Sequence, residues 1–307
     1  MNHSVESIRS SNGQDTVHIQ SWSPDIEPIG VVQLIHGMIE HIARYDDFAR
    51  FLVSLGYVVI GHDHVGHGET AGKKGKYGHF GEEGGAQVLV DDCGLIHQLA
   101  AARYPECPYF ILGHSMGSLV LRNYLFRQPQ PLNGAIIMGT TMEPAILMKS
   151  AQFVTQLLKP FAKYEWPYQI MDQLVFGKHN QRFRPNRTTK DWLSSDEAQV
   201  DLYLQDPHTQ FHFSLAAYRD LFALTKSASD RKQLQTIDPQ LPLLLISGDQ
   251  DPVGHYGKSV YQLAQQLEAN TDITVYLLEN GRHEILNEKQ HMIVYKEMRK
   301  WLSEKSQ

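Results

Sequence analysis

The stretch from Tyr109 to Phe126 reads YFILGHSMGSLVLRNYLF, and the rest of the chain is interpreted outward from it. Its first four residues form an aromatic and aliphatic run that is typical of a buried strand. Its last part, from Leu119 to Phe126, places apolar residues at mostly helical spacing. Between the two lies the pattern Gly-x-Ser-x-Gly, with Ser115 at its centre. The pattern predicts a serine on a tight turn between a strand and a helix.

A serine in this position suits nucleophilic chemistry. Because a hydroxyl is a weak nucleophile, it must stand clear of the sheet edge, next to a base and to backbone N–H donors. We expect the turn to strain the backbone of Ser115, and Gly113 and Gly117 to avoid a clash where the strand and the helix cross. The alternative is a loop serine between two glycines, since the pattern also occurs by chance.

Length and composition limit the class of protein. The chain has 307 residues, 42% of them hydrophobic, and a formal charge of −6, which suits one large α/β domain with an insertion. The mild acidity, without a basic stripe, predicts no nucleic-acid partner. Two cysteines, Cys93 and Cys107, are too few for a disulfide scaffold, so we expect a reducing, cytoplasmic compartment. We see neither a secretory signal nor an apolar run long enough to span a membrane.

The apolar runs alternate between strand-like and helix-like patterns. Segments 5–9 and 16–22 predict an antiparallel hairpin. Buried strands are predicted at Gly30–Ile35, Tyr57–Gly61, Gly134–Met138, Leu243–Ser247 and Ile273–Leu278. Helices are predicted at Tyr45–Leu55, Ala86–Tyr104, His255–Leu267 and Gln290–Trp301, and a glycine-rich loop at 66–85. This alternation predicts an α/β fold whose mostly parallel sheet is covered by helices on both faces.

The alternation stops between residues 141 and 240. Apolar residues from Leu147 to Phe161 recur at intervals of three and four and predict a helix, and further helical stretches are predicted near Asp191–Leu204 and Phe213–Leu224. No buried strand is predicted there, so we interpret 141–240 as a helical cap inserted into a core of residues 1–140 and 241–307. We expect most of its many aromatic residues to pack onto the core and some to line an acyl-binding pocket.

A nucleophilic serine requires a base and a group that orients the base, both at the carboxyl ends of strands. The strand at 243–247 leads into Gly-Asp-Gln-Asp-Pro-Val, which offers Asp249 and Asp251 as the acid. The strand at 273–278 leads into Glu-Asn-Gly-Arg-His-Glu, which offers His283 as the base. The order along the chain is then Ser, Asp, His, as expected for an α/β-hydrolase fold.

The sequence resembles the monoacylglycerol lipase and lysophospholipase branch of the α/β-hydrolases over nearly its whole length. The matching segments are His36-Gly-Met-Ile-Glu-His41 with Arg44-Tyr45, Asp63-His-Val-Gly-His-Gly68, Gly113-His-Ser-Met-Gly117, Ser247-Gly-Asp-Gln-Asp-Pro-Val253 and Gly281-Arg-His-Glu284. Val65 stands where an arginine is usual in this family, in a structural loop. The resemblance implies Ser115 as the nucleophile and His283 as the base. It selects Asp251 as the acid, because the family's acid follows the glycine by three residues.

Two backbone N–H groups are needed to bind the negative charge that develops on the substrate oxygen. We expect one from Met116, directly after the nucleophile, and the other from Met38, in the loop after the strand at 30–35. Glu40 and Arg44 lie four residues apart near a helix start, where a helical ion pair would contribute about 0.3–0.5 kcal/mol. The resemblance implies instead that they shape a polar, substrate-binding pocket beside this loop.

His62, His64 and His67 form a histidine-rich segment that is similar to the zinc-binding run of metallo-β-lactamase-type hydrolases. That pattern requires an aspartate directly before the third histidine, where this chain has Gly66. We therefore predict no metal ion, and the resemblance implies no organic cofactor.

The resemblance implies small-molecule acyl esters, monoacylglycerols or lysophospholipids, as substrates. A proline-type aminopeptidase, or another amide or thioester hydrolase, is the alternative on the same triad. It would need acidic cap residues to hold a free amino group, for which Glu143, Glu165, Asp172, Asp196 and Glu197 are available. A catalytically silent ligand-binding relative is the alternative of another class. We also expect transient contact of the cap with a lipid surface, and the sequence leaves the oligomeric state undefined.

Overall fold

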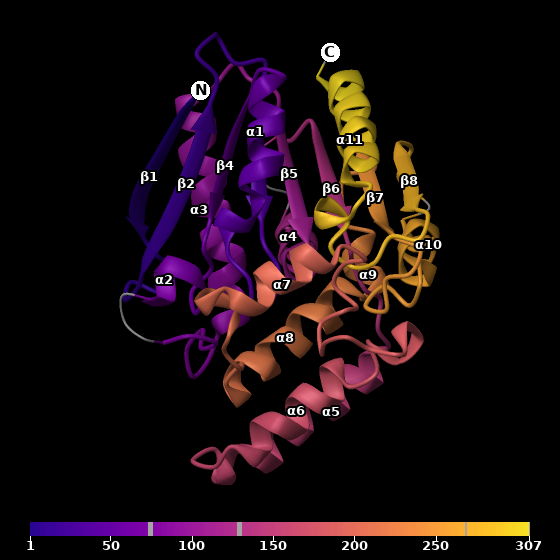
Figure 1. The fold of residues 1–307 in the computed structure, drawn as a ribbon. Coiled ribbons are helices and arrows are strands. Elements are labelled where there is room, and N and C mark those ends of the chain that lie inside the picture. Colours follow the sequence, from indigo (N-terminus) through magenta and orange to yellow (C-terminus); the bar gives the residue numbers. More distant parts are fainter. Residues whose placement is uncertain (73–75, 128–130, 268, 307) are drawn as a thin grey trace.

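An eight-stranded sheet runs through the computed structural model, which describes residues 1–72, 76–127, 131–267 and 269–306 (Figure 1). Its strands are β1 (Asn2–Arg9), β2 (Thr16–Ser23), β3 (Gly30–Ile35), β4 (Tyr57–His62), β5 (Tyr109–His114), β6 (Gly134–Met138), β7 (Leu243–Gly248) and β8 (Ile273–Leu278). They lie in the order β1-β2-β4-β3-β5-β6-β7-β8. The β1–β2 hairpin joins β4 in antiparallel register, and all later pairs are parallel. The predicted hairpin and the mostly parallel α/β sheet are confirmed.

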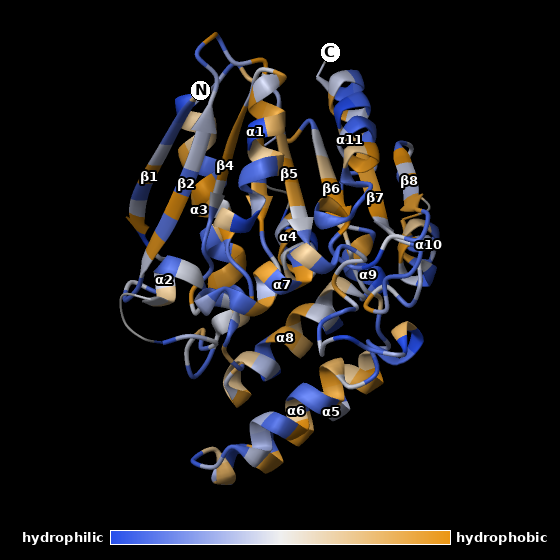
Figure 2. Cartoon of the chain, viewed as in Figure 1, coloured by the Kyte–Doolittle hydropathy of each residue, from blue (hydrophilic) through white to orange (hydrophobic). Residues whose placement is uncertain are grey.

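Helices cover both faces of this sheet. They are α1 (Asp46–Ser54), α2 (Gly68–Gly72), α3 (Gly85–Arg103), α4 (Met116–Leu125), α5 (Ala145–Leu158), α6 (Trp166–Phe176), α7 (Glu197–Gln205), α8 (Leu215–Ala228), α9 (Arg231–Leu234), α10 (Lys258–Gln266) and α11 (His291–Lys305). In Figure 1, α1 and α11 lie in front of the sheet, and α3 and α4 lie behind it. Successive side chains of a strand point to opposite faces, so Ile111 packs in one core cluster and Phe110 and Leu112 in the other. Both clusters exclude water, which is why the central strands are hydrophobic along their length (Figure 2).

Some predicted helix boundaries are wrong. The helix α6 was not predicted, because Pro167 follows its first residue; a proline is tolerated in the first turn, where an N–H has no helical partner. Residues 191–196 form turns, and α7 begins only after Asp196, whose carboxylate caps it. The helix expected from His255 begins at Lys258, since His255 and Tyr256 have positive φ angles. The short helix α2 interrupts the predicted glycine-rich loop.

Residues 141–240, all of which are described, contain helices and no strand, and they lie below the carboxyl ends of the parallel strands in Figure 1. Arg122 of α4, a fully buried residue, ties the two ends of this segment together. Its guanidinium donates to the carbonyl oxygens of Thr141 at 2.7 Å and Ala228 at 2.9 Å, and to the Thr140 hydroxyl at 3.0 Å. The segment is therefore anchored to the helix that follows Ser115.

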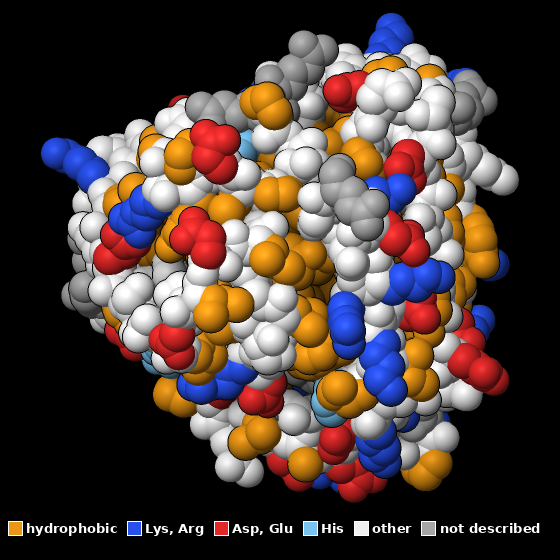
Figure 3. All heavy atoms as spheres, turned by 90° about the horizontal axis from the view of Figure 1, so that it is seen from above, with side chains coloured by type: hydrophobic (Ala, Val, Ile, Leu, Met, Phe, Trp, Pro, Cys, Tyr) orange, Lys and Arg blue, Asp and Glu red, His pale blue; other side chains and the backbone are white. Residues whose placement is uncertain are grey.

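The outer surface carries charges of both signs. Figure 3 shows the molecule from the end of the sheet where the termini lie, and acidic and basic side chains are interspersed there among hydrophobic ones. Within the described ranges, no helix combines the length and the apolar character needed to cross a lipid bilayer.

The turn between β5 and α4 approaches β3 closely. A Cβ atom added at Gly117 would lie 2.2 Å from the Ile35 carbonyl oxygen and 2.6 Å from that of His36. One added at Gly113 would lie 2.4 Å from the Gly117 carbonyl oxygen. The expected clash at both glycines is confirmed, and it arises against backbone atoms that cannot rotate away.

We predict that Gly117→Ala lowers the free energy of unfolding by about 1–3 kcal/mol, because a methyl group would force α4 away from β3. Urea unfolding followed by circular dichroism measures this change. Gly72→Ala is the matched control, since its Cβ would meet side-chain ends rather than backbone, of which the Tyr77 hydroxyl at 3.0 Å is the nearest. Equal unfolding midpoints for the two variants would contradict the prediction.

Candidate active site

Ser115 joins the carboxyl end of β5 to the first turn of α4. Its backbone has φ 53° and ψ −119°, a conformation that a residue with a side chain rarely adopts. The Ser115 N–H donates to the Met138 carbonyl of β6 at 2.9 Å, and the Ser118 N–H donates to the Ser115 carbonyl at 2.9 Å. These bonds hold the strained turn that the sequence predicted, and the serine side chain faces a cavity.

Ser115, His283 and Asp251 form a continuous chain of hydrogen bonds. His283 Nε2 lies 2.9 Å from Ser115 Oγ, and His283 Nδ1 lies 2.9 Å from Asp251 Oδ1. His283 is only 3% exposed and Asp251 is fully buried. Asp249, the other acid considered, accepts a hydrogen bond from its neighbour Gln250 instead. This arrangement can transfer a proton from the serine hydroxyl to the imidazole while a carboxylate faces the other ring nitrogen.

The Asp251 carboxylate is held in its charged form. Burial would raise its pKa, but attraction to His283, a hydrogen bond with it, and hydrogen bonds from the Val253 N–H and the Ser247 hydroxyl together outweigh burial, so the pKa is lowered. Asp251 therefore remains an acceptor for His283 at neutral pH.

The His283 imidazole is also fixed from its sides. The Trp192 ring lies 5.2 Å from it and the His114 ring 4.8 Å, measured between ring centres. The His283 N–H donates to the Trp192 carbonyl at 3.4 Å. Sequence reasoning did not single out Trp192, because its position in the helical insertion carries no motif.

The loop after β3 brings a second set of backbone donors to Ser115. Met38 and Met116 line the same cavity as Ser115 and His283. Ile39 has a positive φ of 56°, and its carbonyl accepts a hydrogen bond from the Tyr203 hydroxyl at 2.9 Å. Within the described residues, neither the Met38 nor the Met116 amide donates to a protein acceptor. Both amides are therefore available to bind an oxyanion.

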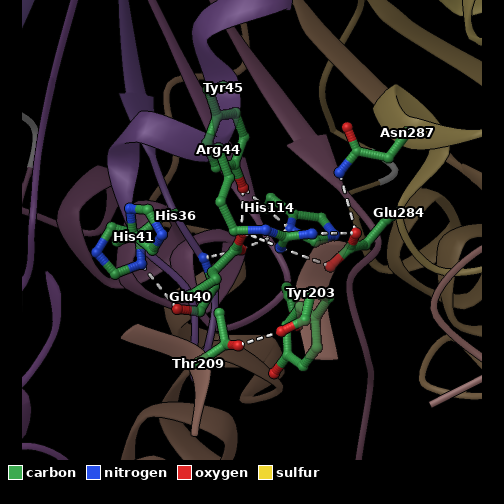
Figure 4. Close-up of polar contacts among 12 residues, drawn as sticks. His36, Glu40, His41, Arg44, Tyr45, His114, Tyr203, Thr209, Glu284 and Asn287 are labelled. Carbon is green, nitrogen blue, oxygen red and sulfur yellow. Dashed lines mark hydrogen bonds and ion pairs between the residues drawn. The ribbon is translucent and has the colours of Figure 1, made fainter. Parts of the chain in front are cut away.

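Glu40 is the centre of a buried polar network that reaches from this loop to Glu284 (Figure 4). Its Oε1 accepts from the Gly37 N–H, from the Tyr45 hydroxyl at 3.0 Å and from His114 Nδ1 at 3.0 Å. Arg44 Nη1 donates to Glu40 Oε2 at 3.0 Å. Burial would raise the pKa of Glu40, but its contacts with His114, Arg44 and Gly37 outweigh burial and lower the pKa to about 2.

Arg44 connects this network to the residue that follows His283. Its guanidinium makes a bidentate pair with the Glu284 carboxylate, at 2.8 and 2.7 Å, and lies 4.9 Å from the centre of the Tyr203 ring. Attraction to Arg44 lowers the pKa of Glu284 in spite of its burial. The pair at positions 40 and 44 is therefore more than an exposed helical ion pair. Glu284 and Tyr203 were missed by sequence reasoning, because they lie far from Arg44 along the chain.

The cavity above Ser115 has a volume of ≈ 260 Å³. It is enclosed by the core on one side and by α5, α6 and α8 on the other. Its apolar wall includes Leu119, Met148, Ala151, Val175, Leu221 and Phe222. An apolar cavity that opens onto a serine hydroxyl can hold an aliphatic chain next to the reacting atom.

The histidine-rich segment lies buried behind the loop after β3. His64 N–H donates to His36 Nε2 at 3.0 Å, His64 Nε2 lies 3.3 Å from the His36 carbonyl, and His67 Nδ1 lies 3.2 Å from the Val65 carbonyl. Burial lowers the pKa of His62 to about 4, and burial together with the nearby His64 lowers the pKa of His67 to about 3. Among the residues that the structure describes, no group of three or more His, Cys, Asp or Glu is arranged to hold a metal ion.

Comparison with known proteins supports a common origin over most of the chain. A protein-family model described as serine aminopeptidase, S33, matches residues 26–290. The chain is 29% identical over 283 residues to a monoacylglycerol lipase of Mycolicibacterium smegmatis, covering 92% of this chain and 90% of that protein. It is 27% identical over 286 residues to the monoglyceride lipase of Rattus norvegicus, covering 92% and 85% of the two chains.

Solved structures share the fold. A thermostable carboxyl esterase from Bacillus coagulans, crystallised with glycerol, superposes with a TM-score of 0.92 at 28% identity, over 100% of both chains. A soluble variant of the monoglyceride lipase of Saccharomyces cerevisiae has a TM-score of 0.78 at 19% identity, over 100% of this chain and 96% of the other, and therefore shows the fold alone.

We predict that the neutral, buried His62 makes stability depend on pH. The unfolded chain takes up a proton near pH 6.5, whereas the folded chain resists protonation until about pH 4. The free energy of unfolding therefore falls as the pH is lowered through this window, by about 1.4 kcal/mol per pH unit for this one group. Urea unfolding at several pH values should show a shallower loss for His62→Gln than for the wild type. His3→Gln removes an exposed histidine as the control, and parallel curves for all three proteins would contradict the prediction.

Proposed function

The chain belongs to the serine aminopeptidase, S33, family, and we propose that it is a serine hydrolase that cleaves carboxylic esters of the monoacylglycerol and lysophospholipid type. The observation that carries this proposal is the chain of hydrogen bonds from Ser115 through His283 to Asp251 at the base of an apolar cavity. Relatives with 29% and 27% identity over nearly the whole chain are named monoacylglycerol and monoglyceride lipases, which supports ester substrates.

In the proposed mechanism, Ser115 Oγ attacks the ester carbonyl while His283 Nε2 takes the hydroxyl proton. Asp251 orients the imidazole and stabilises its charged form. The Met38 and Met116 amides bind the oxyanion of the tetrahedral intermediate. His283 then gives its proton to the departing alcohol, and a water molecule hydrolyses the acyl-enzyme with His283 again as the base. Each step uses groups of this chain, and none requires a metal ion or an organic cofactor.

The cavity charges favour an ester over a peptide with a free amino group. An aminopeptidase site would need an unpaired carboxylate to hold the ammonium group. The cavity carboxylates are instead paired, Glu143 with His255 at 2.7 Å, and Glu40 and Glu284 with Arg44. Of the other cap acids considered, Asp172 bonds to His212 and Tyr218, and Asp196 caps α7. The alternative of a silent binding protein is disfavoured by the hydrogen-bonded serine.

We propose that residues 141–240 act as a cap on a core formed by 1–140 and 241–307. The apolar wall from α5 and α8 then holds the acyl chain, and Glu40 and Arg44 shape the polar side of the cavity near the alcohol part of the ester. A cytoplasmic location is supported by the two cysteines, Cys93 and Cys107, which are both free thiols.

The cap also presents hydrophobic side chains to the outside. They lie on α5, on α6 and between these helices, which form the lower edge of the molecule in Figure 2. Those more than one-third exposed are Ile146, Leu147, Phe153, Leu157, Phe161, Tyr164, Trp166, Ile170 and Leu174. An exposed apolar surface of this kind suits transient contact with a lipid surface from which a substrate could enter the cavity.

We predict that Ser115→Ala abolishes ester hydrolysis and labelling by a fluorophosphonate without loss of folding. Asp251→Asn should lower kcat by roughly 10³–10⁴-fold, because the imidazole loses the charge that orients it. Asp249→Asn is the matched control and should change kcat less than about threefold. Rates on a monoacylglycerol, with circular dichroism as the folding check, measure these effects. A larger loss in Asp249→Asn than in Asp251→Asn would overturn the acid assignment.

A second prediction concerns the lipid surface. Replacing Phe153 and Leu157 together by serine should lower the fraction bound to phosphatidylcholine vesicles at least about fivefold, since each exposed side chain loses apolar area that lipid could cover. Cosedimentation measures binding, and hydrolysis of a short-chain ester in solution checks that the site remains active. Tyr261→Ser on α10 removes an equally exposed side chain elsewhere and is the control. Equal losses of vesicle binding in both variants would contradict contact of the cap with the lipid surface.

A further inference from the structure

The cap side of the cavity carries Lys190, whose ammonium packs against aromatic rings. Its Nζ lies 4.9 Å from the centre of the Phe176 ring and 5.7 Å from that of Tyr203. Among the described residues, no carboxylate lies within ion-pair distance of this group. The half-buried ammonium, placed against two aromatic rings, therefore retains hydrogen-bond donors for a ligand in the cavity.

His179 is a second polar group on the same wall. Its ring packs edge-on against Trp192 and Phe176, with distances of 4.7 and 5.7 Å between ring centres. Its Nδ1 atom is buried and makes no hydrogen bond within the part of the chain that the structure describes. Lys190 and His179 thus both pack against Phe176, and both line the cavity.

The two groups are held in place by one asparagine. Asn180 Oδ1 accepts from the Trp192 N–H at 2.8 Å, and Asn180 Nδ2 donates to the Thr188 carbonyl at 2.9 Å. Asn180 follows His179, and Lys190 lies between Thr188 and Trp192. These bonds therefore fix the two chain segments against each other, so the positions of Lys190 and His179 do not depend on a ligand.

The carboxylates of the cavity wall have ion-pair partners within the protein. Glu143 pairs with His255, and Glu40 and Glu284 pair with Arg44. Within the described residues that line the cavity, Lys190 is the charged side chain without an ion-pair partner, and Asp172 and Glu284 attract it only from a distance. The Lys190 ammonium therefore offers an unpaired cation to a negatively charged ligand group on this part of the wall.

The position of these groups indicates which part of an ester they face. Trp192 lies against His283, and His283 must give its proton to the departing alcohol. The alcohol part of the ester therefore lies on the His283 side of the cavity. On that side Trp192 packs against Phe176 and His179, and Phe176 packs against Lys190. The apolar wall from α5 and α8 remains for the acyl chain.

We propose that Lys190 and His179 form a subsite for a phosphate on the alcohol part of the ester, so that acylglycerol phosphates are substrates. This inference rests on the proposed function and adds the class of alcohol. The Lys190 ammonium donates charge-assisted hydrogen bonds to the phosphate oxygens, and the His179 ring donates one through Nε2, because Nδ1 is sealed from the cavity. Burial lowers the pKa of Lys190, and burial with the nearby His283 lowers that of His179 to about 4. A bound anion offsets this burial penalty.

The test compares octanoyl glycerol with octanoyl glycerol phosphate, which share one acyl chain and differ in the alcohol, on the full chain. The measured quantity is the kcat/KM of the phosphate ester divided by that of the neutral ester. Lys190→Met should lower this ratio about tenfold or more, the factor expected for a lost hydrogen bond to a charged group. Lys190→Arg should retain most of the ratio. Lys178→Met removes an exposed charge nearby and should leave the ratio unaltered.

His179→Phe tests the second group while keeping a ring against Trp192 and Phe176. It should lower the same ratio several-fold, through the KM of the phosphate ester. Equal losses on both esters in Lys190→Met and His179→Phe would indicate a structural role and overturn the subsite. A wild-type chain that cleaves only the neutral ester would also overturn it and leave the proposed function standing. Cleavage of neither ester would contradict the proposed function itself.

Two further experiments test whether the anionic group bound at Lys190 belongs to the alcohol part of the ester. Inorganic phosphate that inhibits wild type but not Lys190→Met, without any Lys190 effect on the ester ratio, would indicate a site for free phosphate and overturn the substrate assignment. An octanoyl-length ester with a carboxylate at the end of its acyl chain tests the opposite orientation. If Lys190→Met lowers kcat/KM more for this ester than for the phosphate ester, the subsite faces the acyl chain and the proposal is wrong.

Discussion

The strained backbone of Ser115 is the constraint on which the rest of the site depends. A conformation with φ 53° and ψ −119° costs of order 1–3 kcal/mol and persists only where the surroundings enforce it. Here β6 accepts the Ser115 N–H, and the absence of a side chain at Gly117 lets α4 lie directly against the carbonyl of Ile35. The sheet and the helix therefore hold the Ser115 hydroxyl at one position. His283 and the loop that carries Met38 must be positioned around it by other contacts.

Arg44 links the loop that carries the Met38 amide to the segment that carries His283. Its guanidinium pairs with Glu40, which organises the loop carrying Met38, and with Glu284, which follows His283. Charges buried in this way are costly to desolvate, so such pairs add little to stability compared with apolar packing. Their effect is geometric, because one planar cation joins the loop of Glu40 to Glu284, which lies 240 residues after Arg44 in the chain.

The proposed reaction and the proposed phosphate subsite use opposite features of the same cavity. The reaction depends on groups that are fully paired, such as Asp251, whose carboxylate accepts from His283, Val253 and Ser247. Recognition of the alcohol depends instead on Lys190 and His179, whose side chains have no ion-pair or hydrogen-bond partner among the described residues. Paired groups hold their geometry before the substrate arrives, whereas unpaired ones gain a partner only when it binds.

The sequence alone determined the sheet and the turn at Ser115, because strand and helix periodicity and a turn motif are local properties of the chain. It also placed His283 and two candidate acids, Asp249 and Asp251, after the last two strands, and the family resemblance selected Asp251. Only the tertiary structure decided the contacts of the cap. Lys190, Trp192 and Tyr203 lie in or beside a stretch that was predicted only as helical and carries no motif, and their roles depend on packing against residues far away in sequence. Even the helix starts at Glu197 and Lys258 were misjudged, since a capping carboxylate and two positive φ angles overrode the apolar spacing. Long-range packing is not encoded in any short window, so these features appear only when the chain is folded.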